Sequence, residues 1–345
     1  MKNAALSCRN VVAPLSCRYD VISLYRNIER RLFLVAAMFF LLTSCEYKEL
    51  CYDHNHWTRE SIAFDWSKSF GAQPKGMTAL IYDVEKGSQE PIHYDLVGML
   101  GGEIRLLPGT YQTLAYNYDT ETILYRGMDR VNTLEAYTRV SSVEEGTRLT
   151  RSGMPRAVES EYVILEPDTL WAGVSTAKYM EHADSLYNIW VTPEPRFVEV
   201  DITITNVPNL QYTGQFGGAL SGLAPSVYMS TGELGEGCAT QAFTCAVVDA
   251  TTLHMNFRIF GHCPHSDQGI SNKHMLTIYA ILADGSKWYY TQDVTDQMHS
   301  PSHNPDVEHV NIELDGIPVP KPIVNGSGFQ PTIDGWQGVE IDVGM

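Results

Sequence analysis

The sequence predicts an all-β protein built as two β-sandwich domains with few short helices. Strict alternation of apolar and polar residues, the mark of half-buried strands, recurs in the segments 198–205, 253–259 and 310–315. Turn signals separate the strands, and helical periodicity is scarce, which favours a sandwich over an α/β fold. Residues 45–345 number 301 (345 less the first 44), so about two domains of ordinary size are expected.

Four further strands are expected in the first half of the chain. They are rich in aromatic and β-branched residues, and turn residues such as Pro108-Gly109 end them. The best helical pattern in the chain is short and acidic, and it predicts a helix over 176–187. The four expected strands are 77–84, 103–107, 111–118 and 162–165.

An Asp-Gly pair predicts a tight hairpin late in the chain. Residues 276–282 form one strand, Asp284-Gly285 follows at once, and 287–290 return as the second strand. The tail beyond this hairpin is rich in proline and glycine, which interrupts regular pairing. Alternation returns at 339–343 and predicts a last short strand, either a domain edge or a strand donated to another protein.

Two prolines mark the expected boundary between the sandwiches. Pro193 and Pro195 end one pattern, and a clean strand begins at Val198. The expected organisation is an upstream extension with a lipoprotein signal peptide (1–44), a lipidated tether (45–60), an N-terminal β-sandwich (61–194) and a C-terminal β-sandwich with a Pro/Gly-rich tail (195–345).

Cys45 is the expected lipidation site. It closes the run Leu42-Thr43-Ser44-Cys45, which follows three arginines and an 11-residue apolar stretch. That stretch is too short for a membrane-spanning helix, which needs ~20 residues. A buried core segment ending in cysteine is the alternative, but the residues after Cys45 are polar. Cleavage before Cys45 leaves an acylated N-terminus, and two or more acyl chains anchor a protein stably to a membrane.

The charge of the mature chain limits its partners. Residues 1–44 hold six basic and two acidic residues, which leaves 18 basic and 39 acidic residues and a net charge of −21. A body this acidic repels the phosphates of nucleic acid and of anionic membrane surfaces. We therefore expect no nucleic-acid partner, and membrane attachment through the N-terminal lipid.

Cysteine spacing leaves the disulfide pairing open. Besides Cys45, the mature chain carries Cys51, Cys238, Cys245 and Cys263, which allow three full pairings. The last three lie close in sequence, so one local disulfide among them is an interpretation, and small buried thiols are the alternative.

No motif in the chain predicts catalysis or a cofactor. A P-loop, a zinc-protease helix and a dinucleotide-binding turn are all missing from the sequence. The segment 218–222 resembles a nucleophile elbow but has one residue too many before its serine. We therefore predict that the protein is not an enzyme.

Three groups of ligand-type or nucleophilic residues are better explained as linker and turn residues. None of them supplies enough partners at the spacing that a tetrahedral metal cage or a catalytic pair with an orienting group requires. The groups are Cys51, Asp53, His54 and His56; His299, His303 and His309; and Cys263, Pro264 and His265.

Aromatic residues raise a second binding hypothesis. The chain holds 19 tyrosines and 6 tryptophans, and such rings stack on sugars in some β proteins. Nothing in the sequence groups them onto one surface, so packing on strand faces is the simpler interpretation, and glycan binding is the alternative.

The order of several segments resembles the lipoproteins of gut anaerobes that belong with the fimbrillin-type pilus proteins. The likeness covers nearly all of the mature chain, and its specificity lies in the order of the segments. The segments are the lipidation run with the following Cys-Glu-Tyr-Lys-Glu-Leu-Cys-Tyr-Asp-His-Asn-His, Leu-Pro-Gly-Thr-Tyr-Gln-Thr-Leu-Ala-Tyr-Asn-Tyr-Asp-Thr-Glu at 107–121, Leu-Ser-Gly-Leu-Ala at 220–224, Asp293-Val294-Thr295, and Gly328-Phe329-Gln330-Pro331 to Trp336.

This resemblance implies two sandwiches of transthyretin-like topology and a lipidated precursor delivered to the outer membrane. It further implies a cell-surface role in a pilus (fimbria) or in cell adhesion, as the base anchor or as a polymerising subunit. A polymerising subunit must lose its lipid by cleavage after Arg or Lys, and it then takes a β-strand from the neighbouring subunit.

Arg59, 14 residues after Cys45, is the possible processing site. A chance surface arginine explains the same residue equally well. Because nothing beyond Arg59 suggests processing, an anchor or accessory subunit is favoured. The alternative function is a surface glycan- or host-binding lipoprotein that is not part of a pilus.

Overall fold

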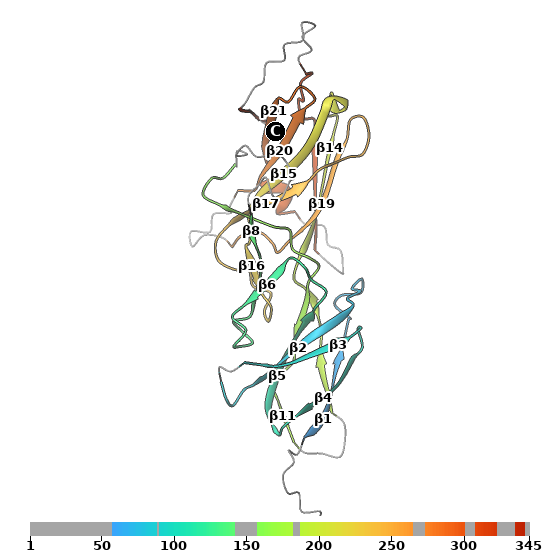
Figure 1. The fold of residues 1–345 in the computed structure, drawn as a ribbon, viewed down its shortest axis with the longest axis vertical. Coiled ribbons are helices and arrows are strands. Elements are labelled where there is room, and N and C mark those ends of the chain that lie inside the picture. Colours follow the sequence, from blue (N-terminus) through green and yellow to red (C-terminus); the bar gives the residue numbers. More distant parts are fainter. Residues whose placement is uncertain are drawn as a thin grey trace, which may run out of the picture. The chain divides into compact units, whose positions relative to one another are not determined.

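The described residues of the chain form five β-sheets, drawn as arrows in Figure 1. The computed structural model describes residues 57–87, 90–141, 157–181, 187–264, 273–300, 308–322 and 335–341. The helical segments within these ranges are short, namely the 3-10 turn η1 (Leu210–Tyr212) and α3 (Thr295–Met298). The predicted all-β sandwich class is confirmed. None of the helices in the described ranges has the length and apolarity that crossing a membrane requires.

Two sheets face each other in the first sandwich. The smaller sheet has the order β12 (Tyr187–Val191), β1 (Thr58–Phe64) and β4 (Gly101–Leu106). The larger sheet has the order β13 (Glu194–Pro195), β10 (Trp171–Val174), β5 (Gly109–Asn117), β2 (Gly76–Asp83) and β3 (Ile92–Val97), and β11 (Lys178–Met180) also pairs with β5.

Strand β2 is buried on both of its faces. Met77 and Ile81 point into the core between the two sheets of the first sandwich, where they meet Ile62 of β1. Leu80 and Tyr82 point to the other side, into a second core. That second core is closed by a three-stranded sheet of β16 (Ser226–Tyr228), β7 (Glu135–Thr138) and β6 (Ile123–Arg126). Burial on both faces explains why β2 is a nearly continuous apolar run.

The second sandwich also consists of two sheets. One has the order β23 (Trp336–Glu340), β21 (Lys287–Asp293), β20 (Met275–Leu282), β15 (Thr213–Leu223), β17 (Ala239–Thr244), β9 (Tyr162–Ile164) and β8 (Val140–Ser141). The other has the order β18 (Ala246–Val247), β19 (Leu253–Ile259), β14 (Val198–Thr205) and β22 (His309–Asp315).

The alternating strands predicted from the sequence build the core of this second sandwich. Ile202 of β14 lies opposite Met255 of β19 and Ile312 of β22, and all three side chains are buried. Phe257 of β19 stacks on Phe243 of β17, with ring centroids 4.4 Å apart. These strands therefore bury one residue in two, as their alternation requires.

The Asp284-Gly285 hairpin is confirmed. Gly285 has a positive φ of 81°, and its N–H donates to the carbonyl of Leu282. Asp284 accepts hydrogen bonds from the N–H and the hydroxyl of Ser286. Glycine suits this position because a side chain disfavours the left-handed conformation that the turn needs.

Strand pairing crosses the expected boundary at 194/195 in both directions. Strands β8 and β9, which precede it in sequence, complete the seven-stranded sheet by pairing with each other and with β17. Strand β16, which follows it, pairs with β7. The division into domains at this position stays a prediction.

The helix predicted over 176–187 is wrong for its described part. Residues Lys178–Met180 form β11, which pairs antiparallel with β5, and the last expected helical residue, Tyr187, begins β12. In β11 the backbone N–H and C=O groups pair with the edge of β5. In a short helix they could pair only within the segment itself, and such short helices are marginal without packing. Residues 182–186 lie outside the described ranges.

Candidate functional site

Strand β1 is the candidate functional site, because it is the first strand in the described part of the chain and yet lies in the middle of a sheet. It pairs parallel with β12, from Glu60 opposite Tyr187 onward, and antiparallel with β4, from Thr58 opposite Leu106. A central strand is held by hydrogen bonds on both edges. Its removal would leave two unpaired edges and an open core beneath them.

The inward face of β1 is mostly apolar. Ile62 and Phe64 are buried in the core of the first sandwich. Thr58 is also buried, and its hydroxyl donates to the carbonyl of Leu106 at 3.1 Å. The fourth inward residue is Glu60, which is 1% exposed.

Glu60 is a buried acid in an apolar setting. Within the described part of the chain, neither of its carboxylate oxygens has a hydrogen-bond partner. Burial raises the pKa of Glu60 above its ordinary value, and the nearby ammonium of Lys178 acts in the opposite direction. An unsatisfied buried carboxylate costs stability, so the start of β1 is held less firmly than its apolar end.

Sequence reasoning missed both β1 and Glu60. The alternation Thr58, Glu60, Ile62, Phe64 is present, but the charged residue at an inward position disguises it. The strand also begins inside the predicted tether of residues 45–60. An acidic residue in register with buried apolar residues was the available signal.

Arg59, the possible processing site, lies on the outward face of β1. Its guanidinium pairs with the Glu103 carboxylate at 3.2 Å, and both side chains are exposed, so this ion pair contributes little stability. Its cross-strand neighbour is Arg105 of β4. A protease needs an extended, unpaired segment, so cleavage after Arg59 would require this part of β1 to separate from β4. Processing at Arg59 stays a prediction.

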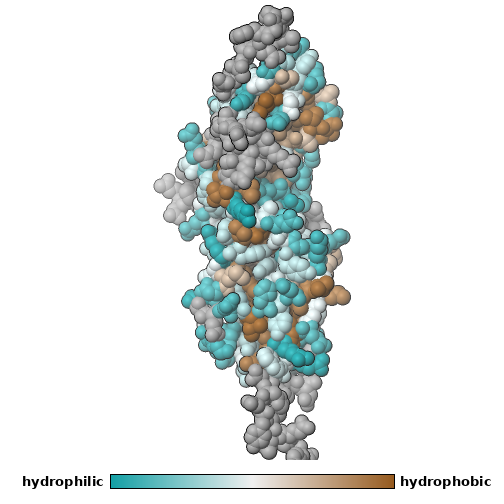
Figure 2. All heavy atoms as spheres, viewed as in Figure 1, coloured by the Kyte–Doolittle hydropathy of each residue, from teal (hydrophilic) through white to brown (hydrophobic). Residues whose placement is uncertain are grey.

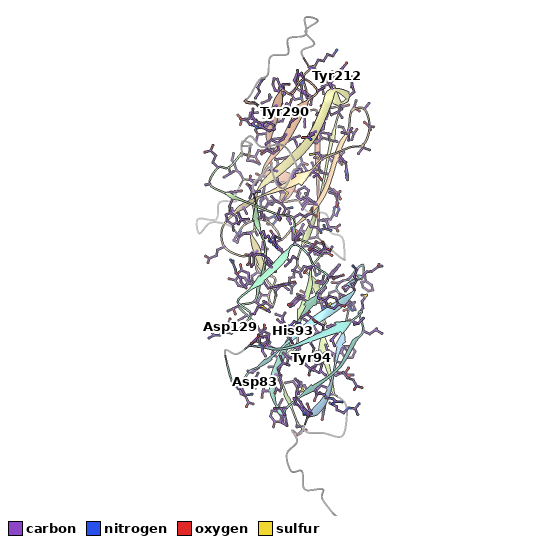
Figure 3. All side chains as sticks on the ribbon, viewed as in Figure 1. Asp83, His93, Tyr94, Asp129, Tyr212 and Tyr290 are labelled. Atoms are coloured by element: carbon purple, nitrogen blue, oxygen red, sulfur yellow. A yellow bond between two sulfur atoms is a disulfide. The ribbon has the colours of Figure 1, made fainter. Side chains whose placement is uncertain are left out.

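The outer edge of β4 is already occupied at one position. The hydroxyl of Tyr94, on β3, donates to the carbonyl of Arg105 at 2.8 Å and accepts from its N–H at 3.3 Å (Figure 3). These two groups of Arg105 are therefore not available to an added strand. A new strand would find this edge partly blocked.

A short strand does lie near the C-terminus, but β23, the last described strand, covers Trp336–Glu340 and so begins three residues before the expected span 339–343, whose last two residues lie outside the described ranges. It pairs parallel with β21 at the edge of the seven-stranded sheet, from Trp336 opposite Lys287 to Glu340 opposite Thr291. The ring of Trp336 meets the ring of Tyr279 at 5.5 Å. The side chains of β23 are exposed or half-buried, and the half-buried Val339 packs against the main core on the other face of the sheet.

One local disulfide forms, between Cys238 and Cys263, 25 residues apart. Cys263 is therefore not a thiol that could act beside an imidazole. Cys245 is free, and burial raises the pKa of its thiol. Cys45, the lipidation site, and Cys51 lie outside the described residues.

The histidines singled out by the sequence do not meet. The ring of His299 stacks on His262 at 4.9 Å, whereas His309 pairs with the Asp201 carboxylate at 2.7 Å. His303 and the group from Cys51 to His56 lie outside the described residues. Among the residues that are described, no three His, Cys, Asp or Glu side chains are placed to hold a metal ion. Ser221, in the elbow-like segment, is buried in β15 and accepts from the N–H of Met275.

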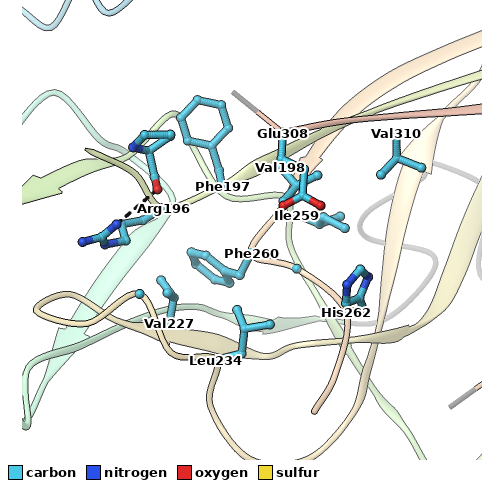
Figure 4. A pocket seen from close by; sticks show the side chains of 13 residues that line it. Arg196, Phe197, Val198, Val227, Leu234, Ile259, Phe260, His262, Glu308 and Val310 are labelled. Carbon is cyan, nitrogen blue, oxygen red and sulfur yellow. Dashed lines mark hydrogen bonds between the residues drawn. The ribbon is translucent and has the colours of Figure 1, made fainter. Parts of the chain in front are cut away.

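A cavity of about 250 Å³ lies beside the start of β14 (Figure 4). Apolar residues such as Phe260 and Leu234 line it together with the polar residues Arg196, His262 and Glu308. The one buried cation, Arg196, donates to the carbonyls of Met229 and Pro195 and to the Glu194 carboxylate. Its hydrogen bonds are thus directed to the protein, and the cavity is smaller than most ligand pockets.

Comparisons with known proteins agree with the architecture. The family model described as a domain of unknown function, DUF5119, matches residues 44–244. A relative from Bacteroides ovatus, Fim4B, whose name describes a fimbrium anchoring subunit, is 28% identical over 113 residues. These residues are 33% of this chain and 33% of that relative, so the chain matches one third of the relative's length.

Two solved structures are also similar. A structure from Bacteroides ovatus described as a candidate adhesin has a TM-score of 0.54 at 20% identity, over 80% of this chain and 99% of the other. The fimbrial anchor protein Mfa2 from Porphyromonas gingivalis has a TM-score of 0.47 at 12% identity, over 75% of this chain and 90% of the other. The first of these likenesses shows a shared fold. With the family match, the resemblance drawn from the sequence motifs is confirmed.

Proposed function

The chain belongs to the DUF5119 family, and we propose that it is a lipid-anchored cell-surface protein of the outer membrane that serves a fimbria as an anchor or accessory subunit. Its partners are pilus subunits, joined by β-strand addition, and the membrane, joined through acylated Cys45. The likeness to the fimbrium anchoring relative supports the fimbrial role. No catalytic activity, cofactor or nucleic-acid partner is part of this proposal.

The placement of β23 is the observation that supports the proposed β-strand addition to pilus subunits. It is the last described strand, it lies at a sheet edge, and β21 remains paired with β20 when β23 leaves. None of its side chains is fully buried, and Trp336 and Val339 supply its apolar contacts. A terminal strand of this kind can pair with another subunit at low cost to its own sandwich.

The placement of β1 favours the anchor over the polymerising subunit. Cleavage after Arg59 would have to open the pairing of β1 with β4, and the remaining residues from Glu60 to Phe64 would still fill the core. An anchor keeps β1 in place, together with the chain that leads back to Cys45. The lipid then holds the protein, and one strand is enough to hold the pilus.

The first experiment is intact mass and N-terminal mapping of the protein from native outer membranes. A diacylated or triacylated Cys45 is the expected result, and it would support a retained anchor. A free N-terminus at Glu60, just after Arg59, would instead mean that the protein is a released subunit and would overturn the anchor.

Strand donation by β23 is tested by truncation. The chain ending at Gly335 lacks β23, whereas the control chain ending at Ile341 keeps it. We expect pilus subunits to co-purify from native outer membranes with the control and not with the shorter chain. Equal co-purification would rule out donation of β23.

Glycan binding outside a pilus is the alternative function. It has one observation in its favour, a group of rings from Tyr279, Tyr289 and Trp336 on the face of the seven-stranded sheet that points away from the main core. Tyr279 has no exposed surface, so a sugar would have to displace β23 to stack on it. Binding of the intact protein to immobilised surface glycans, with a Trp336→Ala variant as the comparison, tests this alternative.

A further inference from the structure

The end of the first sandwich at which the chain enters carries exposed apolar side chains. Trp57, Val84, Leu107 and Tyr179 are 48%, 48%, 40% and 59% exposed, respectively. The space-filling view shows apolar side chains as several separate patches on a mostly polar surface (Figure 2). We call these four residues the entry face.

Backbone pairing brings the entry face together. Trp57 precedes Thr58, whose hydroxyl donates to Leu106, the residue before Leu107. Tyr179 lies opposite Thr110 of β5, and the carbonyl of Thr110 accepts from the N–H of Val84 at 2.9 Å. The four side chains therefore come from segments that meet where β1 begins, β4 and β2 end, and β5 and β11 lie side by side.

The charge at this end differs from that of the whole chain. The mature sequence has 39 acidic and 18 basic residues. Around the entry face the numbers of basic and acidic residues are equal. The basic residues are Arg59, Lys86, Arg105 and Lys178, and the acidic residues are Asp83 (labelled in Figure 3), Glu85, Glu103 and Glu181.

The length of the preceding chain decides what this face meets. Eleven residues lie between Cys45 and Trp57, and even fully extended the chain from one to the other spans only about 40 Å. An acylated Cys45 therefore holds the entry face close to the bilayer at high effective concentration. Tryptophan and tyrosine are the side chains that favour the membrane–water boundary, because each has an apolar body and a polar group.

We propose that the entry face docks on the lipid bilayer, with Trp57, Leu107 and Tyr179 inserted among the headgroups, so that the first sandwich has a fixed orientation on the membrane. This proposal rests on the proposed function, since the lipid on Cys45 supplies the proximity. The occupant is a zwitterionic bilayer surface, because an acidic body is repelled by anionic lipid. Docking would hold the sandwich against the pull of a pilus, which a lipid on a free tether would not.

The same sandwich offers a matched control at its other end. Trp190 is 59% exposed and lies opposite Ala63, near the far end of β1. Leu100 is 89% exposed and immediately precedes Gly101, which also lies opposite Ala63. Both side chains are as accessible as those of the entry face, but β1 separates them from the tether.

The test uses the full chain purified from outer membranes and reconstituted into phosphatidylcholine vesicles with brominated acyl chains, which quench tryptophan only at short range. We expect these vesicles to quench part of the emission of the unaltered protein and of Trp190→Phe, relative to unbrominated vesicles. In Trp57→Phe the brominated vesicles should no longer quench any of the tryptophan emission. Leu107→Glu should reduce the quenching although Trp57 is present, whereas Leu100→Glu should not.

Intact mass measured on the same samples distinguishes a failure of the docking proposal from a failure of the proposed lipid anchor at Cys45. If Cys45 is acylated and Trp57→Phe is quenched as much as the unaltered protein, docking is overturned and the lipid anchor stands. If Cys45 carries no acyl chain, the anchor fails and docking fails with it. Near-ultraviolet circular dichroism of each variant shows that the sandwich is folded.

Discussion

The ring of Trp336 meets the ring of Tyr279 nearly at right angles, with centroids 5.5 Å apart and an interplanar angle of 72°. Trp336 belongs to β23 and Tyr279 to β20, so the contact reaches across β21. Tyr279 is fully buried. On this face of the sheet Trp336 ties the last described strand to the body of the sheet, while Val339 packs on the main core at the other face and β21 pairs with the backbone.

Trp336→Ala should loosen β23 without unfolding the sandwich. Aromatic pairs of this geometry contribute about 1 kcal/mol beyond their buried area, and the other side chains of β23 are exposed or half-buried. Hydrogen exchange of the amides from Trp336 to Glu340 should become roughly tenfold faster, as a change of about 1.4 kcal/mol would predict. Trp190→Ala, at an exposed site, is the control, and equal exchange in both variants would contradict the prediction.

Stability should depend on pH through Glu60. Burial raises its pKa in the folded protein above the ordinary value of 4.5, so the folded state binds the proton more tightly than the unfolded chain. The free energy of unfolding therefore falls as the pH rises above about 4.5 and through the folded-state pKa. Glu60→Gln removes this titration, and at pH 7 the variant should melt above the unaltered protein.

Melting temperatures measured from pH 4 to pH 8 check this expectation. The difference in melting temperature between Glu60→Gln and the unaltered protein should shrink toward about pH 4, where the Glu60 carboxyl is largely protonated in both the folded and the unfolded state. Glu103→Gln changes an exposed ion pair and should shift the melting temperature little at any pH. A constant difference across the range would show that Glu60 does not titrate as its burial requires.

Loss of the Cys238–Cys263 disulfide should destabilise the second sandwich. The bond closes a loop with a sequence separation of 25, and cross-linking a loop of this length reduces the entropy of the unfolded chain by an amount worth about 3 kcal/mol. The double variant Cys238→Ser/Cys263→Ser should unfold at lower denaturant concentration. Cys245→Ser, which alters a free thiol, is the matched control, and an equal loss in both would argue against the bond.

Gly101→Ala should disrupt the pairing of β1 with β4. Gly101 has a φ of 95°, and a Cβ there would overlap the carbonyl oxygen of Ile62 in β1. Gly98→Ala is the control, because Gly98 also has a positive φ, of 76°, but nothing lies near its added Cβ. The control should lose about 1 kcal/mol from backbone strain alone, and Gly101→Ala should lose clearly more in denaturant unfolding. Equal losses of unfolding free energy in the two variants would mean that the Ile62 carbonyl leaves room for a side chain at position 101.

Local patterns predicted the strands that bury one face. β14 and β19 begin and end where the alternation of Val198–Thr205 and Leu253–Ile259 does, because a period of two follows from the backbone of a strand. The turn at Asp284-Gly285 was equally predictable, since its conformation depends on two adjacent residues. In contrast, β11 was predicted as helix, because its pairing with β5 depends on residues far away in sequence.

By itself the sequence determined the all-β class, the inward face of the alternating strands β14, β19 and β22, and the hairpin, and it identified the family through the order of its segments. It also predicts Cys45 as the lipid site, which lies outside the described residues. Only the tertiary structure decided that β1 is a central strand, that Cys238 pairs with Cys263, and that Glu60 is buried. Side-chain direction is a local property of the backbone, whereas the choice of a partner strand depends on which distant edges meet, and alternation carries no information about that choice.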